Sequence, residues 1–259
     1  MSNSEIKKYS KEFIKAKRTQ AFSIILFGLF FCLLTTALIF TAVFFTEILI
    51  SGLENTVAKT AIKIFICLFL IFFSVIILCV YSSVSIGEKA WYNGLTSEKK
   101  NYKKRLYFWF KPKCSLRAFG FKIILLAIKL FCSVAFLLPC ALTIWSVYYL
   151  TQTGGLEMYL FLSLVAGAVL LGISGLIFRF IVIQRYFLAD YIFSTNPKIT
   201  ALTAIRQSKN LLDGHIYEIV RFKLSFIPWF ISCLLIFPSF YFIPYYKASC
   251  SLVAKKITM

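Results

Sequence analysis

The sequence predicts an all-α protein, a polytopic bundle of transmembrane helices, and three observations support this fold class. Hydrophobic residues make up 60% of the 259 residues and charged residues only 15%, against roughly 45–50% and about 25% in soluble proteins. Long uncharged runs recur along the chain, and basic residues collect between alternate runs. A water-soluble fold of this size could not cover so much apolar surface. We therefore expect one integral membrane domain over residues 1–259.

Five apolar runs are long enough to span a membrane. At about 1.5 Å per residue, runs of this length suit the roughly 30 Å hydrocarbon core. The predicted spans are about 21–45, 64–86, 123–150, 158–178 and 224–246. A cleavable signal peptide is the competing interpretation of the first run. That run is longer than the 7–15 residues of a signal-peptide apolar region, so we expect a retained span.

The last run contains three prolines, Pro228, Pro238 and Pro244. Proline removes a backbone hydrogen bond and breaks or kinks a helix. One crossing would also leave the basic C-terminal tail outside. We therefore expect about five spans, with a re-entrant segment or a sixth span at 224–246 as the alternative.

The charges predict the orientation of the chain. The formal net charge is +19, from 29 Lys and Arg against 10 Asp and Glu, and segments 1–19, 87–122 and 185–223 hold most of the basic residues. Cytoplasmic loops carry an excess of Lys and Arg. The prediction is a multi-pass plasma-membrane protein with a cytoplasmic N-terminus and basic cytoplasmic loops at 87–122 and 185–223.

Two amphipathic cytoplasmic helices are also predicted. In segment 1–19, apolar residues recur at helical spacing: Ile6, Tyr9, Phe13 and Ala16. We expect this helix to lie on the membrane surface. A second helix is expected to begin with Asn196 as N-cap and Pro197 at its first position, and to end at Gly214 in the left-handed conformation.

The loop 87–122 contains the strongest candidate for a binding surface, where cations alternate with aromatic residues. Nucleic-acid binding, docking on the anionic lipids of the inner leaflet, and simple anchoring at the interface all use such a pattern. We expect anchoring or lipid binding and no nucleic acid. The candidate residues for contact with anionic lipid or a partner are Lys99, Lys100, Lys103, Lys104, Arg105, Tyr107, Phe108, Trp109 and Phe110.

Lys129 is the candidate for an intramembrane polar site, because it lies about 9 Å into the third predicted span by helical rise. Its long side chain can instead reach the headgroups from that depth. No acidic residue falls at the centre of a predicted span. The carboxylate relays of proton-coupled transport therefore have no place to lie, although coupling through backbone carbonyls stays possible.

The spans also contain small residues and one central proline. In the fourth span, Ser163 and Gly167, and Ala168 and Gly172, are small-xxx-small pairs, which allow helices to approach closely within one chain or between copies. Pro139 in the third span predicts a kink that shapes the bundle or forms a gate.

No catalytic, cofactor or metal site is predicted. The eight Cys show no CxxC spacing, and phosphate-loop and HExxH motifs are absent from the sequence. His215, the single histidine, has no nucleophile suggested by a motif. We expect a protein that is not an enzyme.

The C-terminal third resembles a known family. The matching stretches are Tyr186 to Pro197, Ala204 to Gly214, Phe222 to Trp229 and Pro244-Tyr245. They are similar to a family of bacterial membrane proteins, common in Gram-positive bacteria, described as a domain of unknown function (number nine hundred and seventy-five). The chain departs from its pattern at Leu212, where Met is frequent, and at Ser251-Leu252, where an aromatic pair is usual.

The resemblance implies an all-helical plasma-membrane protein with no assigned activity. The family is also distantly similar to the membrane domain of glycerophosphodiester phosphodiesterases, whose hydrolase part has no counterpart here. The first functional hypothesis is a non-enzymatic module that organises anionic lipid or a partner protein through its basic cytoplasmic face. The second is a small transporter or exporter of an amphipathic or anionic solute. A partner membrane protein or a homo-oligomer is compatible with either.

Overall fold

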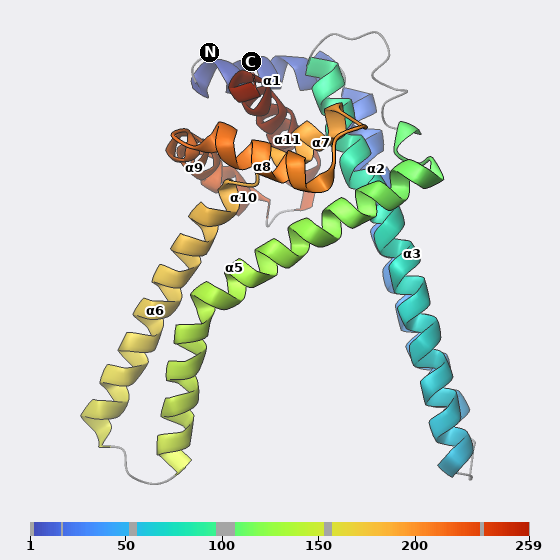
Figure 1. The fold of residues 1–259 in the computed structure, drawn as a ribbon, viewed down its shortest axis with the longest axis vertical. Helices are drawn as coiled ribbons and strands as arrows, with labels where there is room; N and C mark the ends of the chain where they lie inside the picture. The colour runs from blue at the N-terminus through green and yellow to red at the C-terminus, as the bar shows by residue number, and fades with distance from the viewer. Residues whose placement is uncertain are drawn as a thin grey trace.

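The computed structural model describes residues 3–16, 18–51, 56–96, 107–152, 157–233 and 236–258, and every regular element in these ranges is a helix (Figure 1). The elements are α1 (Asn3–Ala16), α2 (Arg18–Ser51), α3 (Thr56–Thr96), α5 (Pro112–Gln152), α6 (Met158–Gln184), α7 (Ala189–Thr195), α8 (Ala201–Leu212), α9 (Ile216–Leu224), α10 (Ile227–Ser232) and α11 (Ile236–Thr258). The predicted all-α fold class is confirmed.

Four long helices form two hairpins that project from one compact region (Figure 1). Helix α2 packs along α3, and α5 packs along α6. The two hairpins diverge, so that their tips lie far from each other and at the end of the molecule opposite both termini (Figure 1). We call the compact region, made of α1 and α7 to α11, the head.

The hairpins expose apolar side chains along their length. Phe65 and Phe72 on α3 are 69% and 63% exposed, and Phe131 on α5 is 76% exposed. In the described residues, three helical stretches are long and apolar enough to cross a membrane: Lys59–Gly94, Pro112–Gln152 and Met158–Thr195. Surfaces of this kind are stable only where lipid or another apolar surface covers them. The chain is therefore compatible with a multi-pass membrane protein.

The hydrophobic core lies in the head and not in the hairpins. Phe121 of α5 stacks on Phe193 of α7 with 4.3 Å between ring centroids, and Trp109 packs against the same Phe193. On the other side, Phe222 and Phe226 are buried beside Phe242. Rings in these arrangements bury much apolar area and pack with defined geometry, so they hold the short helices together.

The region of the predicted last span is divided among three helices. Helix α9 ends at Leu224, α10 occupies Ile227–Ser232, and α11 begins at Ile236. Pro228 lies in the first turn of α10, where its missing N–H is tolerated, so a new helix begins there. The predicted count of about five spans is not confirmed, and both termini lie in the head (Figure 1).

The predicted loops 87–122 and 185–223 are largely helical. Helix α3 continues to Thr96 and α5 already begins at Pro112, while the second segment contains α7, α8 and α9. Apolar residues in both segments face the core of the head. Because this burial stabilises helices, the two segments are helical although their charge predicts loops.

The two amphipathic helices differ in detail from the prediction. Helix α1 turns Ile6, Ser10 and Ile14 inward and packs on α11, so the head covers its apolar face, which was expected to rest on the membrane. The N-cap of α8 is Thr200, whose hydroxyl accepts a hydrogen bond from the Thr203 N–H, and not the predicted Asn196. The left-handed conformation predicted for Gly214 is confirmed, with φ at 92°.

Helix α5 bends partway along its length (Figure 1) and contains Pro139. The ring of Pro139 crowds the preceding turn, and Pro139 donates no backbone hydrogen bond; both effects account for the bend. Beyond the bend, α5 runs beside α6, where Gly175 is buried. A Cβ at Gly175 would lie 2.4 Å from the carbonyl oxygen of Phe136, whereas one at Gly167 would meet nothing within 4 Å. Close helix packing within the chain therefore depends on Gly175.

We predict that Gly175→Ala destabilises the α5–α6 hairpin. The added methyl group has to push Phe136 away, and such overpacking lowers the free energy of unfolding by about 1–3 kcal/mol. Gly167→Ala is the matched control; it should leave stability unchanged or raise it, since Ala favours a helix over Gly. Thermal unfolding in detergent, followed by tryptophan fluorescence, measures both. Equal melting temperatures for the two variants would contradict the packing argument.

Candidate functional site

A buried carboxylate joins three helices where the hairpins meet the head. Asp190 on α7 is 8% exposed and binds two lysines, Lys89 of α3 and Lys122 of α5. The Lys122 Nζ donates to the carboxylate at 2.8 Å, and the Lys89 Nζ donates to its other oxygen. Because Lys89 belongs to one hairpin and Lys122 to the other, this cluster fixes the hairpins to each other and to the head.

The local sequence explains why this aspartate is buried. The stretch from Leu188 to Ser194 is buried throughout, and α7 packs against α3 and α8. A carboxylate in such a place is stable only with charged or hydrogen-bonded partners. The long stems of the two lysines let their ammonium groups reach it from neighbouring helices.

A second ion pair lies beside the first. The Lys247 Nζ on α11 donates to Glu88 on α3 at 2.6 Å. Glu88 directly precedes Lys89, so α3 contributes both an acid and a base at this level of the molecule. The carboxylates of Asp190 and Glu88 are thus both in ion pairs with lysines.

Two further cations have neutral partners. The Arg179 Nε on α6 donates to the Ser133 Oγ on α5 at 2.7 Å, and Ser133 in turn donates to the backbone oxygen of Lys129. The Lys223 Nζ on α9 donates to Gln184 and lies 4.3 Å from the ring centroid of Phe187. Within the described ranges, no carboxylate lies within 4.0 Å of the charged nitrogens of Lys129, Arg179 or Lys223.

These side chains form one electropositive region. Lys129 lies seven residues, about two turns, after Lys122 on α5, and Lys223 donates to Gln184 at the end of α6, the helix that carries Arg179. Burial lowers the pKa of the Lys223 ammonium. We call this region the cationic junction. It consists of Lys89, Lys122, Lys129, Arg179, Lys223 and Lys247 with the two acids Glu88 and Asp190.

Positive charge exceeds negative charge in the cationic junction, so its chemistry favours an anion. Arg and Lys are the usual partners of phosphate and carboxylate groups in proteins, through hydrogen bonds strengthened by charge. In the described part of the chain, no group of three or more His, Cys, Asp or Glu could bind a metal ion. His215 precedes α9 and lies 3.7 Å from Glu218, with both side chains exposed.

The predicted basic loop is only partly described. Lys99, Lys100, Lys103, Lys104 and Arg105 lie outside the described residues. Among the predicted aromatic contacts, Tyr107 is exposed, and Phe110 meets Phe27 of α2 edge to face.

The other two predicted aromatic contacts point into the head. Trp109 is 2% exposed and packs in the core against Phe193, with Phe108 against it. The expectation that Trp109 seats the loop in the membrane interface is therefore wrong, because the ring fills the core of the head instead.

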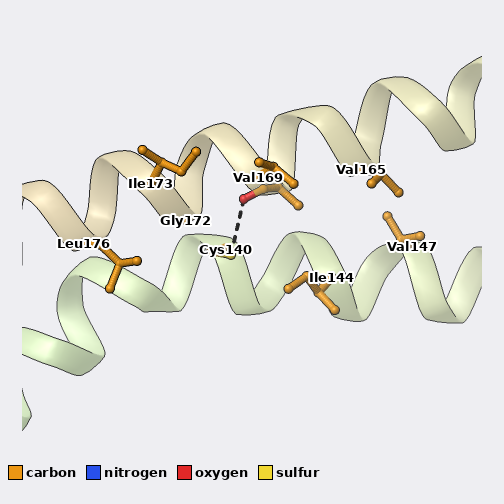
Figure 2. A pocket seen from close by; sticks show the side chains of 9 residues that line it. Cys140, Ile144, Val147, Val165, Val169, Gly172, Ile173 and Leu176 are labelled. Carbon is orange, nitrogen blue, oxygen red and sulfur yellow. Dashed lines mark hydrogen bonds between the residues drawn. The ribbon is translucent and has the colours of Figure 1, made fainter. Parts of the chain in front are cut away.

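Lys129, on α5, belongs to the cationic junction and is half-buried. Two cavities occur elsewhere. One, of about 240 Å³, lies in the head beside Asn93, Gln207 and Thr258. The other, of about 410 Å³, is an apolar groove between α5 and α6 beside Cys140 and Gly172 (Figure 2). Neither is lined by Lys129.

The cluster around Asp190 was not anticipated from the sequence, where Lys89 and Lys122 count only as loop charges. One signal was present. Asp190 is a lone acid inside the apolar stretch Leu188-Ala189-Asp190-Tyr191-Ile192-Phe193. An isolated carboxylate in a stretch that folding buries requires cationic partners, although the sequence does not say which ones.

We predict that Asp190→Asn strongly destabilises the protein. The change leaves two lysines near a buried site without a counter-charge, and breaking a buried ion pair in this way costs about 3–5 kcal/mol. Asp213→Asn, at an exposed position, is the matched control and should change little. Adding Lys122→Met to Asp190→Asn should recover part of the loss, because one stranded charge is removed. Equal unfolding temperatures for the two Asp variants would contradict this role.

Comparison with known proteins gives one match. The model of the family described as "Protein of unknown function (DUF975)" matches residues 1–258. No curated protein and no solved structure matches the chain. The distant similarity to the membrane domain of glycerophosphodiester phosphodiesterases is therefore not shown. Because the match covers nearly the whole chain, the protein belongs to the DUF975 family of proteins of unknown function.

Proposed function

We propose that this protein is a non-enzymatic module of the plasma membrane that binds and organises anionic lipid through the basic side of its head. The observation that carries the proposal is the excess of cations over carboxylates in the cationic junction. The junction lies where the apolar hairpins leave the head, the level at which lipid headgroups would meet it. In the proposed orientation the head faces the cytoplasm, where anionic lipid is enriched.

Electrostatics supports this assignment. Each Lys or Arg near an anionic membrane surface contributes about 1 kcal/mol of attraction. In the sequence, the loop cations Lys99, Lys100, Lys103, Lys104 and Arg105 lie between the end of α3 and the start of α5, and both of these helix ends adjoin the head (Figure 1). A partner membrane protein or a second copy would use the same charged surface. We favour lipid because the apolar hairpins adjoin this surface.

Transport of an amphipathic or anionic solute is the second candidate. It is favoured by one observation, the half-buried Lys129 in a span-like helix that bends at Pro139. Flux of a labelled anionic amphiphile into proteoliposomes that carry wild type or Lys129→Leu tests this candidate. Flux that requires Lys129 would support a transporter, and absence of flux would leave the lipid-binding proposal as the better one.

We predict that replacing Lys99, Lys100, Lys103, Lys104 and Arg105 with Gln reduces selectivity for anionic lipid. The measurement is the association of spin-labelled phosphatidylglycerol, relative to phosphatidylcholine, with the protein in proteoliposomes. About 1 kcal/mol for each cation near the surface corresponds to about a fivefold factor, so the loss of five cations should lower the ratio by more than fivefold at low salt. High salt should reduce the wild-type ratio in the same direction, since screening weakens the attraction.

The matched control removes the same number of charges elsewhere on the head. Lys8, Lys11, Lys15, Lys198 and Lys209 are all exposed, and α1 lies at the end of the head far from the hairpin tips (Figure 1). Their replacement with Gln should leave the ratio near its wild-type value. An unchanged ratio in the loop variant, or an equal fall in both variants, would overturn a lipid-specific role for the loop.

A further inference from the structure

The part of the cationic junction between α5 and α6 has the chemistry of an anion site. Ser133 lies one helical turn beyond Lys129 on α5, and it accepts the hydrogen bond from Arg179 of α6. The Arg179 guanidinium is therefore held beside the Lys129 turn, and its other N–H groups stay available. Lys223 approaches from α9, which packs against α6. In the described residues none of these three cations has a carboxylate within 4.0 Å.

The position of Arg179 along α6 matches the edge of a membrane. Helix α6 begins at Met158, at the hairpin tip, and ends at Gln184, at the head (Figure 1). At about 1.5 Å per residue, Arg179 lies about 30 Å from the tip, which equals the thickness of the hydrocarbon core. If the tip lies at one face of the membrane, Arg179 lies at the level of the headgroups on the other face.

An apolar groove begins within one helical turn of Arg179 on α6, and on α5 it begins at Cys140, on the tip side of Lys129. The groove between α5 and α6 has a volume of about 410 Å³ and is lined by side chains such as Ile144, Val169 and Leu176 (Figure 2). Leu176 precedes Arg179 by less than one turn, and the groove continues from there toward the hairpin tip. Gly172 leaves space in it, since only the Cys140 Sγ approaches a Cβ built there, at 3.2 Å.

We propose that the α5–α6 hairpin holds one anionic phospholipid, with its phosphate on Lys129 and Arg179, Lys223 nearby, and an acyl chain in the groove beside Val169 and Gly172. This inference rests on the proposed function and names the site of lipid binding. A phosphate matches the donors of Arg and Lys. The adjoining groove is apolar and runs from Arg179 toward the hairpin tip. It therefore suits an acyl chain joined to the phosphate and not a free anion.

The test measures the phospholipid that stays with the purified protein. The full chain is extracted in mild detergent and analysed by native mass spectrometry, after incubation with phosphatidylglycerol, with phosphatidylcholine or with inorganic phosphate. Wild type should retain one phosphatidylglycerol. The variant Lys129→Gln/Arg179→Gln should retain about a hundredfold less, because each of the two lost charge-assisted contacts costs about a factor of ten in binding.

Two further variants make the result specific. Val169→Trp fills the groove without changing charge, and it should also reduce retention of phosphatidylglycerol. Arg206→Gln/Lys209→Gln removes two exposed charges from α8 and should retain lipid as wild type does. Retention is compared only among variants that elute as wild type does in size-exclusion chromatography, and Val169→Trp tests the groove if the double variant fails to fold.

Three outcomes would overturn the inference. They are undiminished retention in the double variant, an equal loss in the α8 control, or binding of inorganic phosphate in place of phosphatidylglycerol. The proposed function is tested by a separate experiment, the lipid selectivity of the loop variant in proteoliposomes, and an unchanged ratio there would refute it. Loss of that selectivity with full retention by the double variant would refute this site alone.

Discussion

The arrangement of the molecule depends on the burial of one carboxylate. Asp190 is separated from Lys122 by 68 positions and from Lys89 by 101, yet it binds both. The first lysine belongs to the α5–α6 hairpin and the second to the α2–α3 hairpin, so the cluster is where the head and both hairpins meet. Such a cluster need not add net stability, since desolvation opposes the attraction. Its effect is to specify which helices meet, because any other pairing would leave a buried charge alone.

The distribution of apolar residues follows from the same division between head and hairpins. Short helices of the head bury their apolar faces against one another and against the adjoining ends of α3 and α5, with Phe121 of α5, Phe193 and Trp109 at the centre. The long helices bury little inside the chain and turn residues such as Phe65 outward. A protein built in this way has its own core only in the head. Lipid has to cover the remainder, and this gives lipid contact a structural role in addition to any functional one.

The cations fall into two groups with different consequences. Lys89, Lys122 and Lys247 neutralise acids within the fold. In the described residues, Arg179 and Lys223 have only hydroxyl, amide or ring partners, and no carboxylate lies within 4.0 Å of Lys129. The charge of these three residues therefore acts on whatever lies next to them. Charge alone does not separate these groups in the sequence, because a lysine in an ion pair and a lysine available to a ligand are written with the same letter.

The sequence by itself determined the helical class, the apolar hairpins and the close of α8 at Gly214, because these depend on local composition, run length and backbone conformation. It also marked Lys129 as unusual by its depth in an apolar run. Only the tertiary structure decided that Trp109 lies in the core, that the 224–246 region divides at Pro228, and that Asp190 joins Lys89 to Lys122. These features are contacts between segments far apart in the chain, and no periodicity or spacing records which distant residues share one buried site.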